Sequence, residues 1–571
     1  MEVSARWMQV ESIRPATPSR GGGEEMIRGR LNPLSSLRLT WRRLAVGLCR
    51  QFYGRLGAHW HSICAPIRAA LIRCLGLLMV LGVPLANTAH AASSVTVAIT
   101  SDFVSRSPYG DTTAQIFGIW CQIYGCLATY DPATGKLAPL LAETWTRDPE
   151  NASAWIVKVR QGLKRHKDGR ELKAEDVVHS IWRAKNDPTS KQAGSFEEIS
   201  GSEVIDAYRL RIKTKFPSAV LPIETFDQLI VTGKDLHEQH GPEKADRDFA
   251  LGWGPYELRQ NAIGQRMVLE KNKAWPGIKV ENPDRLIFIR VPEAEAQLTG
   301  LHNGEIQIAS LIPPHMISRL ESKPGFKARI VASAEGMFLG MNSKFPPWDK
   351  KVAHIAVAHA VNKEQIIEKI YRGQAQLLPG PVGEGQFGWS PDMKPRYEYN
   401  PQKARAILEE NGLVGAEVQL SVTTNRFLYD VQAAEAIVPM LEAVGFKVNF
   451  TTPEYATQFA EIQKGNRPFY FHSRGNMMDP TAALVQMFQS GVTARVRYSN
   501  KLFDQALAES RGADNEAERL ALLRKAISVM EEDAPVVWLW RPNNIYGVNA
   551  TRVEFTPTPH NRVSGTSIIV R

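Results

Sequence analysis

The sequence contains few cysteines, five among 571 residues. Three of them, Cys49, Cys64 and Cys74, fall within the first 91 residues, which leaves Cys121 and Cys126 for the rest of the chain. No histidine or second cysteine pair lies at zinc-ligand spacing around these two, which argues against a zinc site. Either a disulfide, which an oxidising compartment would preserve, or two unpaired buried thiols fits their positions.

Catalytic motifs are also missing. The sequence has no GxSxG elbow, no HExxH and no GxxxxGK[ST] phosphate loop. Its one GxGxxG match, Gly383 to Gly388, follows Pro379 and Pro381 and precedes Trp389, so it predicts a loop and not a nucleotide site. The thirteen histidines are scattered. We therefore expect no catalytic residue, no metal and no cofactor, and interpret the chain as a protein that is not an enzyme.

The chain lacks an excess of basic charge outside its first residues. The formal net charge is +10, but residues 1–91 hold 12 Arg and 4 acids, whereas the remainder holds 57 basic and 55 acidic residues. A nearly neutral body has no field that would hold a phosphate backbone. This distribution argues against a nucleic-acid partner.

No apolar run reaches membrane length. Arg68 and Arg73 precede the run CLGLLMVLGVPLAN, which ends in small residues up to Ala91. A basic flank, a short apolar core and a small-residue exit predict a secretory signal peptide over about 68–91, too short for the ~20 residues of a membrane span. We expect a soluble product in the periplasm. The preceding residues are then a disordered extension or belong to a start assigned too far upstream, and Trp41 to Arg43 leaves a twin-arginine signal as an alternative.

The rest of the chain mixes strand and helix patterns, which indicates an α/β protein of more than one lobe. Strands are predicted at 95–100, 155–160, 209–214, 287–291, 329–333 and 418–422, and helices at 173–186, 351–371, 402–411, 430–444 and 515–532. Another helix is expected to end at Gly125. Asp479-Pro480 predicts a helix start, so the preceding loop joins the carboxyl end of a strand to a helix, a place where α/β proteins bind ligands.

Sequence blocks in a fixed order carry a family resemblance. They include LAPLLAETW, VRQGLKRHKDGRELKAEDVVHSI, GWGPYEL, LHNGEIQIA, AHAVNKEQII, YNPQKARAILEENG and EEDAPVVWLW. The most specific is the second, with Arg160, Gly162, His166, Asp168 and Gly169 on the family spacing. Together they resemble the periplasmic solute-binding proteins of ABC importers, family 5, which includes dipeptide, oligopeptide, nickel and glutathione binders.

The resemblance implies an α/β, two-lobed periplasmic binding protein of type II, of the large class with an extra domain, whose hinged lobes close around a central cleft. Hinges are expected near Gly336 to Asn342 and Ala534 to Trp540. The partners it implies are a small solute, an inner-membrane ABC permease and its ATPase, with the protein itself a monomer. The domains expected are a leader at 1–91, lobe I at 92–125, 243–333 and 536–571, an insertion domain at 126–242, and lobe II at 334–535.

The resemblance also points to ligand-binding residues. In the family's peptide binders, an aspartate three residues before Asp-Pro holds the ligand's α-ammonium, and here that position is Asn476. A neutral amide forfeits a charged hydrogen bond of about 1.5 to 3 kcal/mol. Arg474 could clamp a carboxylate, and Met477 could give apolar contact. The predicted ligand-binding residues are Ser101, Asp102, Trp253, Asn342, Trp389, Arg474, Asn476, Met477, Asp479 and Trp540.

The hypothesis that results is the solute-binding subunit of an ABC importer, which captures a peptide or peptide-like solute in the periplasm and delivers it to a permease. Within binding proteins, the alternatives are a metal chelate, an oligosaccharide or a small organic acid. From another class, the alternative is a secreted hydrolase.

Overall fold

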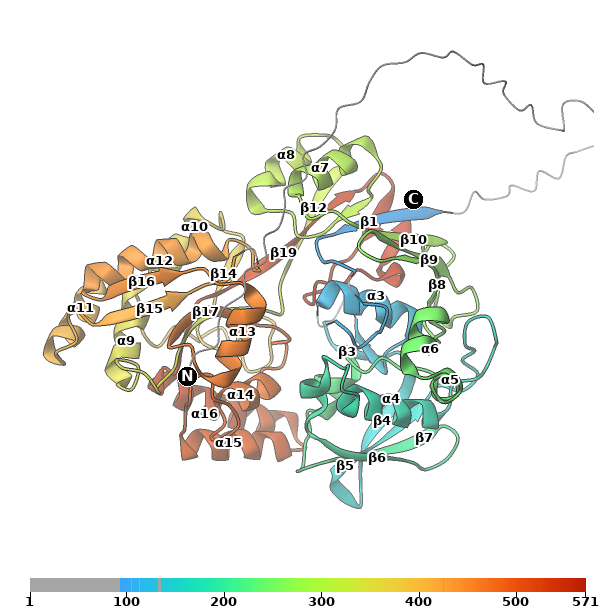
Figure 1. The fold of residues 1–571 in the computed structure, drawn as a ribbon, viewed down its shortest axis with the longest axis horizontal. Helices are drawn as coiled ribbons and strands as arrows, with labels where there is room; N and C mark the ends of the chain where they lie inside the picture. The colour runs from blue at the N-terminus through green and yellow to red at the C-terminus, as the bar shows by residue number, and fades with distance from the viewer. Residues whose placement is uncertain (1–92, 104, 112, 132–134, 425) are drawn as a thin grey trace, which may run out of the picture. The chain divides into compact units, whose positions relative to one another are not determined.

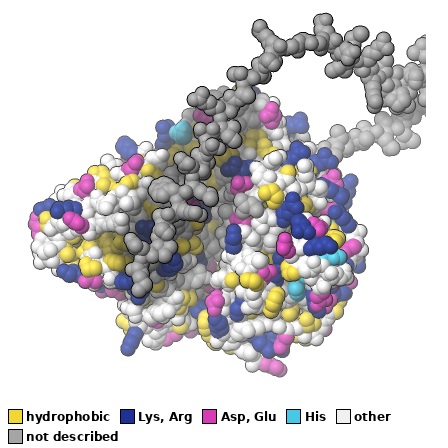
Figure 2. Space-filling model, in the orientation of Figure 1, with side chains coloured by type: hydrophobic (Ala, Val, Ile, Leu, Met, Phe, Trp, Pro, Cys, Tyr) yellow, Lys and Arg dark blue, Asp and Glu magenta, His cyan; other side chains and the backbone are white. Residues whose placement is uncertain are grey.

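The computed structural model describes residues 93–571 except 104, 112, 132–134 and 425. The predicted signal peptide and the extension before it lie outside this range. Among the described residues, no helix combines the length and the apolar character needed to cross a bilayer. On the face that Figure 2 shows, basic and acidic side chains lie interspersed, as the nearly equal numbers of the two kinds predict.

An eight-stranded mixed sheet contains the first strand of the described chain (Figure 1). Strand β1 (Ser94–Ile99) pairs in parallel with β10 (Arg285–Arg290) and β11 (Ile308–Ala309), and its buried VTVAI run suits a strand covered on both faces. The other strands pair antiparallel: β8 (Tyr256–Ala262), β9 (Arg266–Lys271), β12 (Phe326–Ala332), β14 (Ala375–Leu377) and β19 (Trp540–Asn549).

Helices pack against this sheet: α3 (Ala114–Tyr124), α7 (Ala294–Asn303), the 3-10 turn η3 (Pro314–Met316) and α8 (Ile317–Glu321). Helix α3 ends at Gly125, as predicted, where φ is 87° and an added Cβ would lie 2.7 Å from the Leu141 side chain. Directly across this helix end, Cys121 and Cys126 form a disulfide with Cα atoms 5.4 Å apart. Of the two alternatives left open by the sequence, the structure has the disulfide.

A four-stranded antiparallel sheet lies within the segment between α3 and β8. Its order is β4 (Ala142–Asp148), β5 (Asn151–Val159), β7 (Arg209–Thr214) and β6 (Ile199–Val204). Helix α4 (Ala174–Asn186) covers it, close to the predicted bounds. The same segment also contains β2 (Ala128–Tyr130), β3 (Leu137–Pro139), η1 (Ala193–Phe196), the π-turn η2 (Pro222–Phe226), α5 (Lys234–His240) and α6 (Pro242–Asp248). Near the end of the chain, β20 (Val553–Phe555) and β21 (Ile568–Val570) form an antiparallel pair, with η4 (Gly565–Ser567) between them in sequence.

A five-stranded sheet forms the second lobe. Its order is β16 (Lys447–Thr451), β15 (Glu417–Ser421), β17 (Phe469–Arg474), β13 (Gly336–Met341) and β18 (Val536–Trp538). One face packs on α9 (Lys351–Ala360), α11 (Pro401–Glu410) and α12 (Asp430–Val444), and the other on α14 (Thr481–Phe488), α15 (Lys501–Gly512) and α16 (Glu516–Asp533). Two short helices, α10 (Lys363–Lys369) and α13 (Tyr455–Lys464), complete it.

One predicted helix is wrong in extent. The pattern over 351–371 predicts a single helix, but α9 ends at Ala360 and a second helix, α10, begins at Lys363. The reason is local: the Asn362 side chain accepts a hydrogen bond from the Gln365 backbone N–H at 3.0 Å and caps a new helix.

The chain passes between the two large sheets several times, since β14 falls between β13 and β15 in sequence but pairs with β19, and two of these passages are short. It leaves β12 and enters β13 through residues 333–335, and it leaves β18 and enters β19 at Leu539. Both crossings lie next to the predicted hinges. Because β18 pairs with β13, residues 536–538 belong to the five-stranded sheet. The predicted domain boundaries as a whole stay a prediction.

Candidate solute-binding site

The loop that follows β17 is positioned from both sides. Strand β17 lies inside the five-stranded sheet between β13 and β15, and α14 begins at Thr481. Asn476 has a left-handed backbone (φ 57°), a conformation that asparagine tolerates better than most residues. The Asp479 side chain accepts hydrogen bonds from the Thr481 backbone N–H at 3.0 Å and from its hydroxyl at 2.6 Å. The helix begins one residue after Pro480, so the predicted start is confirmed to within a residue.

Asp479 forms an ion pair within the protein. Its Oδ2 lies 2.8 Å from Nη1 of Arg519, and both side chains are buried. The Arg519 guanidinium in turn stacks over Phe387 at 3.7 Å from the ring centroid. A buried carboxylate with a partnered guanidinium is satisfied by the protein itself. Asp479 therefore holds the loop in place, and a direct solute contact from it stays a prediction.

Arg474, at the end of β17, has a different environment. Its Nη2 donates to Oε1 of Gln486 at 2.7 Å, while its shielded Nε has no partner, and among the described residues no carboxylate forms an ion pair with it. Burial, followed by the nearby charge of Arg495, lowers the pKa of Arg474 to about 10. The guanidinium is therefore still charged at neutral pH, with N–H groups left to donate. Such a group suits a carboxylate from outside the protein.

The remaining loop residues divide between packing and exposure. Met477 is fully buried in the core that includes Phe338 and Trp538, and its backbone N–H donates to the Ala334 carbonyl at 2.8 Å. Met478 accepts a hydrogen bond from Phe387 through its carbonyl at 2.8 Å. Asn476 is half-buried. Of Met477 and Asn476, the two predicted ligand-binding residues among these, Asn476 is the one whose side chain is not fully buried.

Three predicted residues serve the fold. Trp253 is fully buried and donates its indole N–H to the Arg170 carbonyl at 3.1 Å. Asn342 is fully buried, and its amide donates to the carbonyls of Gly465 and Ala494, both at 3.1 Å. Trp540, fully buried at the start of β19, packs 5.4 Å from the ring of Tyr371. Any solute contact by these three stays a prediction.

The other predicted residues lie near the surface. The Ser101 hydroxyl donates to Oε1 of Gln115 at 2.8 Å, and Asp102 is exposed with Arg290 at 3.7 Å. Trp389 is half-buried and its carbonyl accepts from Nη2 of Arg524 at 2.8 Å. The hydrogen bond from the Phe387 backbone N–H to the Met478 carbonyl joins the segment that contains Trp389 to the loop after β17. Among the described residues, no hydrogen bond or ion pair joins Ser101 or Asp102 to that loop.

Sequence reasoning did not identify two buried histidines, His472 and His560. His472, on β17, is surrounded by the rings of Phe338, Phe427 and Phe459 at 5.7 to 6.0 Å, and burial followed by the charge of Arg495 lowers its pKa to about 3. His560 stacks on Tyr130 with centroids 4.0 Å apart. Neither histidine lies in a motif. The aromatic run before Arg474 was the one local signal that could have indicated His472.

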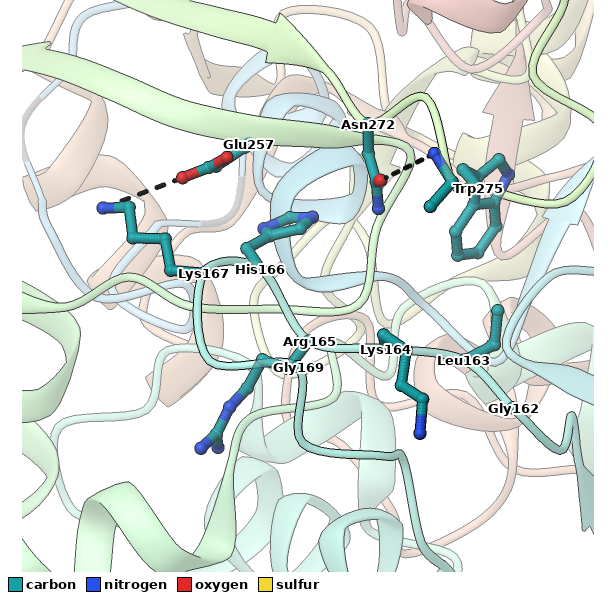
Figure 3. A pocket seen from close by; sticks show the side chains of 11 residues that line it. Gly162, Leu163, Lys164, Arg165, His166, Lys167, Gly169, Glu257, Asn272 and Trp275 are labelled. Atoms are coloured by element: carbon teal, nitrogen blue, oxygen red, sulfur yellow. Dashed lines mark hydrogen bonds and ion pairs between the residues drawn. The ribbon is translucent and has the colours of Figure 1, made fainter.

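A separate pocket of about 350 Å³ is formed by the segment 162–169 with parts of β8 and the turn after β9 (Figure 3). In that view the imidazole of His166 lies between Glu257 and Asn272. Its Nε2 donates to the Gly254 carbonyl at 2.9 Å, and Nδ1 has no partner among the described residues, so the pocket contains a hydrogen-bond acceptor. None of the ten predicted ligand-binding residues lines this pocket.

The fold defines the class of the protein. A periplasmic binding protein, DppA from Helicobacter pylori in complex with the peptide STSA, superposes with a TM-score of 0.72 at 22% identity and covers 84% of this chain and 98% of its own. The architecture is therefore that of a two-lobed type II periplasmic binding protein, and the predicted fold class is confirmed.

The family follows from the sequence match. Residues 136–495 match the model of the bacterial extracellular solute-binding proteins, family 5, and the chain belongs to this family. It is 26% identical to the dipeptide-binding protein of Escherichia coli K12, over 73% of this chain and 83% of that protein. It is 25% identical to the glutathione-binding protein GsiB of the same strain, over 79% and 89%. These proteins bind solutes and are not enzymes, which confirms the interpretation drawn from the sequence.

Proposed function

We propose that this chain is the solute-binding subunit of an ABC importer and that it captures a peptide or peptide-like solute through a carboxylate held by Arg474. The observation that carries the proposal is the state of that half-buried guanidinium: it is charged, its shielded Nε has no partner among the described residues, and Nη2 donates to the amide of Gln486. A guanidinium removed from water is costly unless a negative group reaches it. A solute carboxylate supplies that group.

A peptide-type solute is supported by the relatives. The two curated relatives described above carry the names dipeptide-binding and glutathione-binding protein, and both of these solutes end in carboxylates. The loop with Asn476 occupies the place expected to read the solute. A small organic acid would use Arg474 in the same way, whereas an uncharged oligosaccharide would leave the guanidinium without a counter-charge.

The mechanism proposed is closure by differential affinity. A solute that touches both lobes stabilises the closed form relative to the open form, and only that difference in binding free energy shifts the equilibrium. In this proposal lobe I consists of residues 92–125, 243–333 and the chain after β18, residues 126–242 form the insertion domain, and lobe II extends from 334 through β18. The closed, monomeric protein then delivers its solute in the periplasm to a membrane permease driven by an ATPase.

A thermal-shift screen of the purified full-length protein tests the proposal. Dipeptides, tripeptides, glutathione, small organic acids, sugars and nickel chelates are added one at a time. A peptide or acid present at 100 times its dissociation constant is expected to stabilise the protein by about 2.7 kcal/mol. Arg474→Met should abolish the shift, while Arg405→Met, which changes an exposed arginine on α11, should retain it. Stabilisation by sugars alone would contradict the proposal.

A further inference from the structure

His560 is a buried side chain with unused hydrogen-bonding groups. It is 8% exposed, and neither Nδ1 nor Nε2 has a hydrogen-bond partner among the described residues. Its ring stacks on Tyr130 with an interplanar angle of 22°, so one face is packed while the ring edge carries the two free nitrogens. Buried polar groups in proteins are nearly always paired, and two unpaired nitrogens on one ring call for a functional reason.

Backbone hydrogen bonds join His560 to the loop that carries Arg474. The Ala334 N–H donates to the carbonyl of Pro559 at 2.9 Å, and the Ala334 carbonyl accepts from the Met477 N–H at 2.8 Å. Ala334 lies in the crossing from β12 to β13. One residue therefore links the segment before His560, which follows β20, to the loop after β17.

The stacking partner of His560 lies in the same electrostatic neighbourhood. Burial, followed by the negative charges of Asp227 and Asp479, raises the pKa of Tyr130 well above its ordinary value. Asp479 belongs to the loop, so Tyr130 lies within its electrostatic reach. Asp227 is paired with Arg562, whose Nη1 lies 3.1 Å from Oδ2. Tyr130 and His560 thus stack within the electrostatic range of Asp479, while Asp227 and Arg562 beside them are paired with each other.

The charge state of the imidazole fixes what it can recognise. Burial, followed by the positive charge of Arg562, lowers the pKa of His560 to about 3, so the ring is neutral at physiological pH. A neutral imidazole offers one N–H donor and one nitrogen acceptor. That pair matches an uncharged amide or hydroxyl and gives no counter-charge to an ammonium. Asn476, on the loop, is also an uncharged donor and acceptor.

We propose that His560 contacts the solute, and that the solute class is a carboxylate-bearing molecule with an uncharged amide or hydroxyl where an ordinary dipeptide has its free ammonium. N-acylated amino acids and N-blocked peptides belong to this class. The inference rests on the proposed function, because it needs the carboxylate at Arg474 to orient the solute. His560 and Asn476 then read the group beside that carboxylate from the two lobes.

The experiment compares acetylated and free forms of the same peptides. Isothermal titration of the full-length protein with N-acetyl-dipeptides and the matching free dipeptides should show tighter binding of the acetylated form. His560→Phe keeps the stacking on Tyr130 and removes both nitrogens, and it should weaken acetylated-peptide binding about 10-fold. His560→Gln, which restores a donor and an acceptor, should recover part of that loss. His302→Phe, at a histidine on α7, is the control and should bind as the unchanged protein does.

Thermal unfolding separates this role from a structural one. His560→Phe should raise the unfolding midpoint of the solute-free protein, because it removes two unsatisfied buried nitrogens. A lower midpoint, or acetylated-peptide affinity unchanged in His560→Phe, would overturn the inference. Equal affinity for free and acetylated peptides, with both lost in Arg474→Met, would also overturn it but leave the proposed function standing. Failure of every carboxylate-bearing solute to bind the unchanged protein would overturn both.

Discussion

Two regions of the molecule hold shielded arginines in opposite ways. In the segment 162–176, Arg165 is 2% exposed and lies 2.5 Å from Asp168 and 2.6 Å from Asp235, while Arg170 lies 2.8 Å from Asp176. At the end of β17, Arg474 donates to an amide, and no carboxylate among the described residues pairs with it. The first region satisfies its charges within the fold. In the second region, the proposal assigns the counter-charge to a solute.

We propose that this difference separates a structural arginine, Arg165, from a solute-binding one, Arg474. A buried ion pair that loses one member leaves an unpaired charge and destabilises the fold. Arg474 forms no ion pair with a carboxylate among the described residues, and Glu224 acts on it only through a longer-range charge interaction, so under our proposal its removal costs the fold little and costs the solute its counter-charge. Substitutions at the two sites should therefore affect different properties, and four predictions test this, beginning with the largest effect.

Replacing Arg474 by Met should weaken binding of a carboxylate-bearing peptide about 100-fold, roughly 3 kcal/mol, because a desolvated charged hydrogen bond is lost. The free energy of unfolding should change by less than about 1 kcal/mol. Isothermal titration and urea denaturation measure the two quantities. A large loss of stability with unchanged affinity would place Arg474 in the structural group with Arg165.

Replacing Arg165 by Met should have the opposite profile. The side chains of Asp168 and Asp235 would face each other without their shared cation, and the free energy of unfolding should fall by about 2 kcal/mol, allowing for their partial exposure. Peptide affinity should stay within about twofold of the unchanged protein. If urea denaturation shows no loss of stability, the ion pairs of this segment do not support the fold.

Replacing Asn476 by Asp would make the loop resemble the segment 162–176, where arginines are paired with carboxylates, because it adds a carboxylate close to Arg474 in sequence. Free dipeptides should bind about 10-fold more tightly through their ammonium, a gain of about 1.5 kcal/mol. N-acetylated peptides should bind more weakly. Competition between the two forms of one dipeptide measures the shift. An unchanged ratio would mean that residue 476 does not face that end of the solute.

The smallest effect concerns pH. Partial burial raises the pKa of Asp235, but hydrogen bonds and charge from Arg165 outweigh it, and the net effect lowers that pKa below its ordinary value of 3.8. A lowered folded-state pKa contributes stability above pH 4 or so that is lost as pH falls through the folded value. After solvent screening the contribution should be below about 1 kcal/mol. Urea denaturation at pH 7 and pH 3 should show a smaller difference for Arg165→Met than for the unchanged protein.

Local sequence patterns predicted those features of the site whose structure is set by residues adjacent in sequence. Asp479 and Pro480 mark a helix start through turn chemistry that needs no distant contact, and Arg474 is placed by counting back from it. The fold class followed from blocks spread along the chain. By contrast, Tyr130 and His560 come together only through folding, across more than 400 residues, and neither lies in a motif.

Residue type alone predicted several positions that the fold uses for packing. Tryptophan suits a solute cleft, but it suits a core equally well, and Trp253 and Trp540 are fully buried. Asn342 was selected for its place after a predicted hinge strand, yet its amide joins two backbone carbonyls. Met477, selected because a thioether can contact a solute, is likewise fully buried in a hydrophobic core. Only the partners of a side chain, which the sequence does not show, distinguish a group held by the fold from one left for a ligand.

The most direct test of the central claim, that Arg474 holds a solute carboxylate, is native mass spectrometry of the full-length protein with a mixture of N-acetyl-dipeptides and their C-terminal amides. The amides differ only in lacking the carboxylate. The unchanged protein is expected to retain the acids and not the amides, and Arg474→Met to retain neither. Equal retention of acids and amides by the unchanged protein would contradict the claim.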